Sequence, residues 1–262
     1  MRIAVCVKQI QGPPASLYRA ELVGQVSNIP KMDPTINEYD LNALEAGLRI
    51  KDQNPKESTV DVLSVGNNLA QDVMKKTLAM GADELILVDD IQANSLDAWG
   101  TMTILKSLLT RGKPYDIILC GRQASDWDQA HVPLLLSEAM GRPTVTNVIN
   151  IQINGKDLIL DRVFEDGTQK IRCPIPAIIT ITSEFGQPRY PTLHGIMSIE
   201  NAKVMLVTLS QLGIKPQFIE PRVRMIELDF PKNKGNVQLI SGADDAEKGR
   251  NLVLRLRQEK QI

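Results

Sequence analysis

Residues 121–141, GRQASDWDQAHVPLLLSEAMG, change halfway from small and polar residues to an amphipathic helix pattern. They follow DIILC, an apolar run typical of a buried strand. Gly121 would let the backbone approach a ligand closely, and Arg122 would add a positive charge. The N–H groups of residues 129–132 would meet a phosphate at the start of the helix. We therefore expect a nucleotide at this turn, although turn formation alone would also explain the glycine and the aspartates.

Two carboxylates, an aromatic ring and an imidazole lie inside the same stretch. Asp126 and Asp128 would repel a phosphate, so we expect them to cap backbone N–H groups or to bind ribose hydroxyls. Trp127 lies in a polar loop, where its ring is free to stack on an adenine or a flavin. His131 lacks an identifiable orienting partner, which favours a neutral hydrogen-bonding role over a catalytic one.

A second polar stretch, DAWGT at residues 97–101, stands at the start of another predicted helix. Capping of that helix would by itself explain Asp97. Trp99 lies on an amphipathic helix, where an aromatic side chain is more often part of the core than a ligand contact.

Composition limits the class of protein. The chain has 262 residues, of which 43% are hydrophobic, so it can bury a sizeable core. The formal net charge is −1 and the basic residues are scattered, so we expect no nucleic-acid partner. No apolar run reaches eighteen residues, and the start lacks a signal pattern, so we expect no transmembrane segment and a cytoplasmic location. The cysteines form no CxxC motif, which favours buried thiols over a zinc site or disulfide framework: Cys6, Cys120 and Cys173.

The elements that position these residues alternate along the first half of the chain. Four short runs rich in branched residues predict strands of a parallel sheet, at residues 2–8, 59–65, 84–88 and 116–120. Helix-spaced apolar residues fall between them: Leu41, Leu44 and Leu48, then Ala98, Met102, Leu105 and Leu109. This order predicts an α/β fold with a mostly parallel twisted sheet flanked by helices, of the Rossmann-like nucleotide-binding kind.

The pattern changes after residue 150. Asn154-Gly155 and Asp166-Gly167 predict the turns of antiparallel hairpins, an excursion from the parallel sheet. A further buried strand is expected at residues 176–182 and a proline-punctuated loop at residues 186–197. From residue 204 the core signal thins until a last amphipathic helix with Ala246, Val253 and Leu256. We expect a domain at residues 1–203 and, at residues 204–262, a C-terminal arm that packs on a partner.

An adenylating or ATP-hydrolysing enzyme of similar α/β fold is an alternative class. It would normally carry GxxxxGK[ST] or another phosphate loop after the first strand, where this chain has KQIQGPPAS. A nucleotide-binding sensor that only dimerises is a third class.

Five ordered stretches resemble the β subunit of electron transfer flavoproteins: VCVKQI, NEYDLNALEAGLRIKD, TLAMGADELILV, GRQASDWDQAHV and PRYPTLHGIM. The resemblance implies a heterodimer with an α subunit around FAD, and a further adenine nucleotide in the β subunit, either AMP or a second FAD. It implies a carrier of electrons between a dehydrogenase and an acceptor, with no catalytic acid, base or nucleophile of its own. Members with two flavins bifurcate electron pairs taken from NADH, but this chain has no separate NAD fingerprint.

The resemblance also assigns site residues. Cys6 and Asn37 would flank the adenosine, and Val65 and Gly66 would close the end of the next strand. FAD is favoured over AMP because DAWGT resembles flavin-holding members and because Arg122 and Gln123 offer donors. His131 stands where the family often has Gln, and Pro133 where it often has Gly; proline in a first helical turn carries little cost. The complete expected cofactor set is Cys6, Asn37, Val65, Gly66, Asp97, Thr101, Gly121, Arg122, Gln123, Ala124, Trp127, Asp128, Gln129, Ala130, His131 and Val132.

The stretch PRYPTLHGIM looks like the family's partner-recognition loop. Leu193 would be the anchor that enters a pocket on the partner dehydrogenase, and the alternative is that Leu193 packs under its own loop. The expected partner contacts are Arg189, Tyr190, Leu193, Ile196 and Met197. In this family the C-terminal arm wraps the α subunit, which agrees with the apolar tail.

Overall fold

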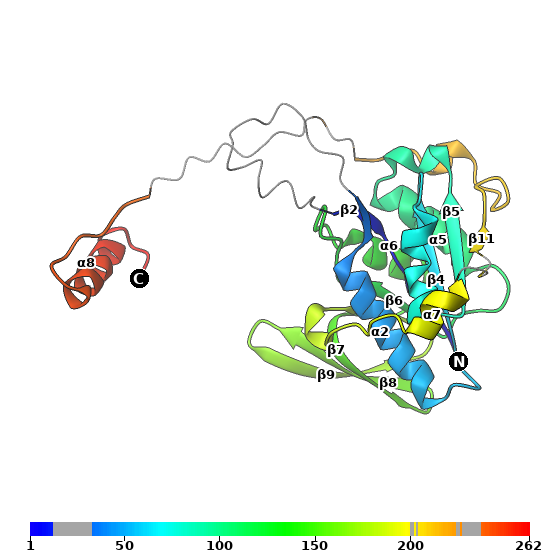
Figure 1. Ribbon diagram of the computed structural model, residues 1–262, viewed down its shortest axis with the longest axis horizontal. Helices are drawn as coiled ribbons and strands as arrows, with labels where there is room; N and C mark the ends of the chain where they lie inside the picture. The colour runs from blue at the N-terminus through cyan, green and yellow to red at the C-terminus, as the bar shows by residue number, and fades with distance from the viewer. Residues whose placement is uncertain (13–32, 200–201, 203, 224–225, 227–236) are drawn as a thin grey trace. The chain divides into compact units, whose positions relative to one another are not determined.

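The computed structural model describes residues 1–12, 33–199, 202, 204–223, 226 and 237–262. It divides into two compact units, Met1–Arg224 and Met225–Ile262 (Figure 1). Each unit is described by itself.

A nine-stranded sheet forms the first unit, in the order β11-β5-β4-β1-β6-β10-β7-β8-β9. All neighbours from β11 to β7 are parallel, whereas β7, β8 and β9 pair antiparallel. The strands are β1 (Arg2–Cys6), β4 (Thr59–Gly66), β5 (Glu84–Asp89), β6 (Ile117–Gly121), β7 (Thr144–Asn154), β8 (Asp157–Phe164), β9 (Gly167–Pro174), β10 (Ala177–Ile181) and β11 (Val204–Leu206). This arrangement confirms the predicted α/β fold.

Helices and short connections complete the described structure (Figure 1). The helices are α2 (Glu38–Gln53), α3 (Gln71–Met74), α4 (Lys76–Met80), α5 (Ala98–Leu109), α6 (His131–Met140), α7 (Leu193–Ser198) and α8 (Asp245–Gln258). Short 3₁₀ helices are η1 (Ile91–Ser95), η2 (Ser183–Phe185) and η4 (Pro216–Phe218). Strands β2 (Gln9–Gln11) and β3 (Pro34–Ile36) form a separate antiparallel pair.

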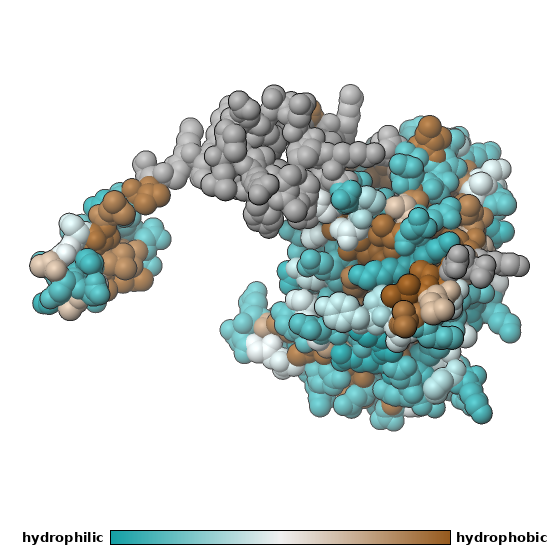
Figure 2. Space-filling view, viewed as in Figure 1, coloured by the Kyte–Doolittle hydropathy of each residue, from teal (hydrophilic) through white to brown (hydrophobic). Residues whose placement is uncertain are grey.

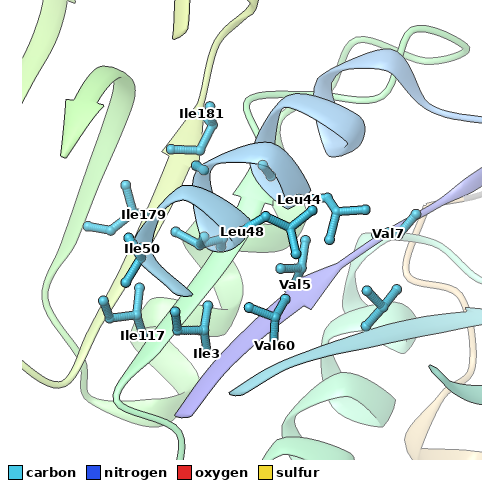
Figure 3. Packing of buried hydrophobic residues seen from close by; sticks show 14 of the residues in the cluster. Ile3, Val5, Val7, Leu44, Leu48, Ile50, Val60, Ile117, Ile179 and Ile181 are labelled. Atoms are coloured by element: carbon cyan, nitrogen blue, oxygen red, sulfur yellow. The ribbon is translucent and has the colours of Figure 1, made fainter. Parts of the chain in front are cut away.

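Two hydrophobic clusters cover the two faces of the sheet. Strand β1 alternates between them, because successive strand residues point to opposite faces. Ile3 and Val5 pack with Leu44 and Leu48 of α2, as Figure 3 shows. On the other face, residues of β1 and β6 pack with α5 and α6: Ala4, Cys6, Ile118, Cys120, Met102, Leu105, Leu109 and Leu136. The predicted apolar faces of α2 and α5 are thus confirmed.

The antiparallel excursion also follows the sequence. Both predicted hairpin glycines have positive φ, +62° at Gly155 and +144° at Gly167. After β9 the chain returns to place β10 between β6 and β7. The expected buried strand at residues 176–182 is therefore confirmed as β10, whose side chains are all buried.

Two segments differ from expectation. Residues 193–198, expected within a loop, form α7, because the Thr192 hydroxyl accepts a hydrogen bond from the Gly195 N–H (3.0 Å) and caps the helix. Residues 204–206 form β11 on β5, and Val207, Leu209 and Ile219 are buried in the second cluster. The expected final helix is confirmed as α8, while the packing of the arm on a partner stays a prediction.

Candidate functional site

The carboxyl ends of β4, β1 and β6 lie side by side in the sheet. Cys6 at the end of β1 pairs with Cys120 of β6 on one side and Leu63 of β4 on the other. Four predicted site residues therefore lie together at the carboxyl ends of these strands: Cys6, Val65, Gly66 and Gly121. In an open parallel sheet, ligands bind beyond the carboxyl ends of the strands.

The start of α2 fixes the loop that follows β6. Asn37 is fully buried, and its side chain does not cap its own helix. Its Nδ2 donates to the Gln123 carbonyl (2.9 Å), and its Oδ1 accepts from the Ser125 N–H (3.2 Å). The Asn37 side chain therefore binds the predicted loop through both the nitrogen and the oxygen of its amide.

Asp40 ties the same loop to the first strand. Its two carboxylate oxygens accept from the N–H groups of Lys8 (2.8 Å) and Gly121 (2.9 Å). A Cβ added at Gly121 would lie 2.4 Å from Asp40 Oδ1. The glycine therefore permits close approach of α2, rather than only of a ligand. Apolar periodicity gave no signal for Asp40, because it marks buried apolar residues and not buried carboxylates.

Burial raises the pKa of Asp40 to about 6, although the Lys8 and Gly121 N–H groups and Asn37 act in the opposite direction. The hydrogen bonds favour the ionised form, and desolvation favours the neutral form.

The two loop carboxylates accept from side chains. Lys8 Nζ donates to Asp126 (2.7 Å), and Gln123 Nε2 donates to Asp128 Oδ1 (2.7 Å). Asp128 lies in the left-handed region, with φ of +50°. Among the hydrogen bonds of the described residues, neither carboxylate accepts from a backbone N–H group, so their roles toward a ligand stay predictions.

The start of α6 leaves donors available. The helix follows Ala130, which has φ of +54° and ψ of 17° and contributes no side-chain cap. The first-turn N–H groups of His131 and Val132 are therefore not capped by a side chain of residue 130, and Pro133 has no N–H to satisfy. Together with the positive end of the helix dipole, these groups can receive an anion.

Arg122 and Trp127 lie in the loop that precedes these donors. Arg122 holds its guanidinium 5.1 Å from the ring centre of Tyr39, and its buried Nε has no hydrogen-bond partner among the described residues. Trp127 is 52% exposed, as a ring available for stacking would be. Ala124 accepts backbone hydrogen bonds from Trp127 and Asp128 through its carbonyl, which closes the loop into a turn.

The DAWGT residues lie after β5, which is separated from β6 by the two strands β4 and β1. Asp97 caps α5, as its Oδ1 accepts from the Gly100 N–H (2.9 Å), and the Thr101 hydroxyl donates to the Asp97 carbonyl (2.9 Å). Asp97 Oδ2 accepts from the N–H groups of Arg222 (2.7 Å) and Val223 (3.1 Å). The capping interpretation of Asp97 is confirmed.

Trp99 contacts protein on both sides. It is partly buried against the second cluster, and the Arg222 guanidinium lies 3.2 Å from its ring centre. Trp99 thus packs against the core without being fully buried in it.

A separate apolar surface lies on and before α7. Tyr190 is 87% exposed, Leu193 is 75% exposed, and Ile196 and Met197 are also exposed. In Figure 2, hydrophobic atoms gather where Figure 1 places α7. The alternative that Leu193 packs under its own loop is wrong. Arg189 differs from these residues, because its guanidinium is bound to Glu45 and Asp52 of α2.

The three cysteines are buried and unpaired, as predicted. Within the described ranges, no group of three or more His, Cys, Asp or Glu side chains could hold a metal ion. None of the helices described is both long and apolar enough to cross a membrane.

Residues 31–212, which include α2, the loop after β6 and α7, match the model of the electron transfer flavoprotein domain. The chain belongs to the electron transfer flavoprotein family. It is 32% identical to the electron transfer flavoprotein subunit beta of Thermoanaerobacterium thermosaccharolyticum, over 98% of each chain. It is 31% identical to the caffeyl-CoA reductase-Etf complex subunit CarD of Acetobacterium woodii, over 99% of each chain. It is also 31% identical to the acryloyl-CoA reductase electron transfer subunit gamma of Anaerotignum propionicum, over the full length of both. These relatives identify the chain as a β subunit of an electron transfer flavoprotein.

Proposed function

We propose that this β subunit pairs with an α subunit and binds an adenine nucleotide at the loop after β6. The observation that carries this proposal is the start of α6, which has no side-chain cap and follows a loop fixed by Asn37 and Asp40. A helix start without such a cap, on the ligand-binding edge of a parallel sheet, suits a phosphate group.

The residues present fit such a group. Arg122 brings a cation and an orphaned buried Nε, and the first turn of α6 brings backbone donors. Trp127 offers an exposed ring, and the Gln123–Asp128 hydrogen bond holds the loop in shape. When bound, FAD would supply the electron-transfer chemistry of the complex. The chain's own residues bind and orient, and none acts as an acid, base or nucleophile.

We favour FAD over AMP as the nucleotide. A pyrophosphate needs a longer row of donors than a single phosphate, and Arg122 adds to the donors of α6. DAWGT supports FAD only through its resemblance, because both carboxylate oxygens of Asp97 already accept backbone hydrogen bonds. Similarity to a caffeyl-CoA reductase-Etf complex subunit supports electron carriage in a complex with a reductase. Bifurcation of electrons from NADH is proposed from the resemblance of DAWGT to family members with two flavins. We propose that the protein acts in the cytoplasm.

The nucleotide content of the purified complex tests this proposal. Acid extraction and chromatography should recover two FAD per heterodimer. One FAD and one AMP would instead indicate a non-bifurcating carrier. A complex without flavin absorbance would overturn electron carriage, and would favour the sensor or the adenylating enzyme.

A variant pair tests the location of the nucleotide. Asp128→Ala removes the acceptor of Gln123 and should lower occupancy of the β-subunit nucleotide while the α-subunit flavin remains. Asp128→Asn is the matched control, because asparagine keeps an acceptor oxygen and tolerates positive φ. Equal nucleotide content in both variants and the wild type would place the nucleotide elsewhere.

We also propose that α7 docks on the redox partner, an acyl-CoA dehydrogenase or reductase, with Leu193 as the anchor. Loss of a buried leucine anchor costs about 2 kcal/mol, or roughly thirtyfold in affinity. Leu193→Ala should therefore raise the KM for the partner by about that factor without release of flavin. Ile91→Ala, at another highly exposed apolar residue, is the control and should leave the KM unchanged.

A further inference from the structure

A polar stripe runs along one face of α2. Asn42, Glu45, Arg49 and Asp52 are spaced by three, four and three residues, so they lie on the same side of the helix. Asn42 and Glu45 are buried. Burial of polar side chains is costly unless they are hydrogen-bonded, and this stripe is bonded to the segment that leads into α7.

The first contacts of the stripe hold residues 185 and 186. Asn42 Nδ2 donates to the Gly186 carbonyl (2.7 Å), and Arg49 donates to the Phe185 carbonyl (3.3 Å). The Arg49 guanidinium also lies 5.0 Å from the ring centre of Phe185. The backbone is thus attached to α2 before it reaches the exposed apolar surface.

Within this stripe, Glu45 accepts several hydrogen bonds from Arg189 and Arg49. Its Oε2 accepts from the backbone N–H (3.1 Å) and Nε (2.8 Å) of Arg189, and its Oε1 accepts from Arg189 (3.3 Å) and from Arg49 Nε (2.8 Å). Burial raises the pKa of Glu45, but the hydrogen bonds from Arg189 and Arg49 outweigh it and lower the pKa. Asp52 binds the same guanidinium (2.7 Å), yet its side chain is 59% exposed, against 6% for Glu45.

By contrast, α7 has little packing of its own. None of its residues is buried, and it begins only four residues after Arg189. It lies close to α4 at Gly195, where an added Cβ would lie 2.3 Å from the Ala79 carbonyl. The direction of α7 therefore depends on how the chain is held at its entrance.

We propose that Glu45 is a positioning residue for partner docking: it fixes Arg189 and thereby sets the direction in which α7 presents Leu193. This inference rests on the proposed docking function of α7. It gives Arg189 an internal role beside any contact with the partner. Glu45 itself stays buried inside the β subunit and acts only through Arg189.

The test uses the purified heterodimer with the acyl-CoA reductase of the same organism, and a tetrazolium dye as an acceptor that needs no docking. Glu45→Gln should raise the KM for the reductase about tenfold, since one charge-assisted contact is lost, with kcat, dye reduction and flavin content unchanged. Asp52→Asn, at the exposed partner of the same guanidinium, should change the KM less than about twofold. Arg189→Lys keeps an ion pair but not the guanidinium contact with both oxygens of Glu45, and its KM should lie between those of the wild type and Glu45→Gln.

Hydrogen exchange supplies a readout that is independent of the partner. The amides of residues 193–198 should exchange faster in Glu45→Gln than in Asp52→Asn. An unchanged KM in Glu45→Gln, where Leu193→Ala does raise it, overturns the inference and leaves docking intact. If neither Glu45→Gln nor Leu193→Ala changes the KM, the proposed docking through α7 is wrong. Loss of dye reduction together with the KM effect would show a merely structural role and overturn the inference.

Discussion

At the scale of single residues, one buried carboxylate joins three elements. Asp40 belongs to α2, and its oxygens bind N–H groups at the end of β6 and just beyond β1. Each such bond to a charged acceptor contributes roughly 1.5–3 kcal/mol, which is offset by the cost of removing the carboxylate from water. Asp40 therefore determines where the loop after β6 starts, and its ionisation links that loop to pH.

The pH dependence follows from the raised pKa. Between 3.8 and about 6 the folded protein keeps a proton on Asp40 that the unfolded chain releases. The contribution of Asp40 to the free energy of unfolding therefore falls as pH rises through this window, by about 3 kcal/mol for a shift of roughly two units, and is constant above it. Urea unfolding of the wild type and Asp40→Asn at pH 4.5 and 7 measures this effect. A difference between the two proteins that does not change with pH would contradict it.

At the scale of elements, α7 shows how one glycine permits close packing. In most helices, replacing glycine by alanine stabilises by up to about 1 kcal/mol. At Gly195 the new Cβ would meet the Ala79 carbonyl, so the sign should reverse. Gly249 in α8 has nothing within 4 Å of an added Cβ and is a matched control.

We expect Gly195→Ala to displace α7 from α4 and to raise the KM for the redox partner, with flavin content unchanged. Gly249→Ala should leave the KM unchanged and stabilise α8. Steady-state kinetics and thermal unfolding of both variants check this pair. A Gly195→Ala protein with normal kinetics would mean that α7 tolerates displacement.

The sequence predicted long apolar elements better than short or polar ones. The strands β1, β4, β5, β6 and β10 were visible because they are short runs rich in branched apolar residues. In contrast, α7 has six residues and β11 has three, too few to show a period. The loop after β6 was predicted as a site, but its support at Asp40 was not, and neither was the contact of Glu45 with Arg189 before α7. Burial of a carboxylate depends on tertiary partners, which periodicity does not reveal.

At the scale of the whole molecule, the boundary between the two units bears on truncation. Val207, Leu209 and Ile219 are buried with the first unit, and each buried side chain of this kind contributes about 1.5–3 kcal/mol. The second unit instead exposes apolar residues on α8, including Leu252, Val253 and Leu254. A helix with exposed apolar residues of this kind is what a subunit interface would cover.

We therefore expect a chain that ends after Val223 to keep a melting temperature close to that of the whole β subunit but to lose association with the α subunit. A chain that ends after Lys203 should melt at a clearly lower temperature, because three buried side chains are missing. Thermal unfolding and size-exclusion chromatography of both truncations test this expectation. Normal heterodimer formation by the chain ending at Val223 would show that the second unit is dispensable for association.

The place of β10 in the sheet has a consequence for synthesis. It fills the gap between β6 and β7, and the carbonyl of its last residue, Ile181, accepts the N–H of Arg122 (2.9 Å), the first residue of the loop after β6. While the chain emerges from the ribosome, β6 is thus an unprotected edge until residue 181 is available. Residues up to 181 must therefore be made before the loop after β6 has its contact with β10, so the newly made β subunit passes through a stage in which it relies on protection from aggregation.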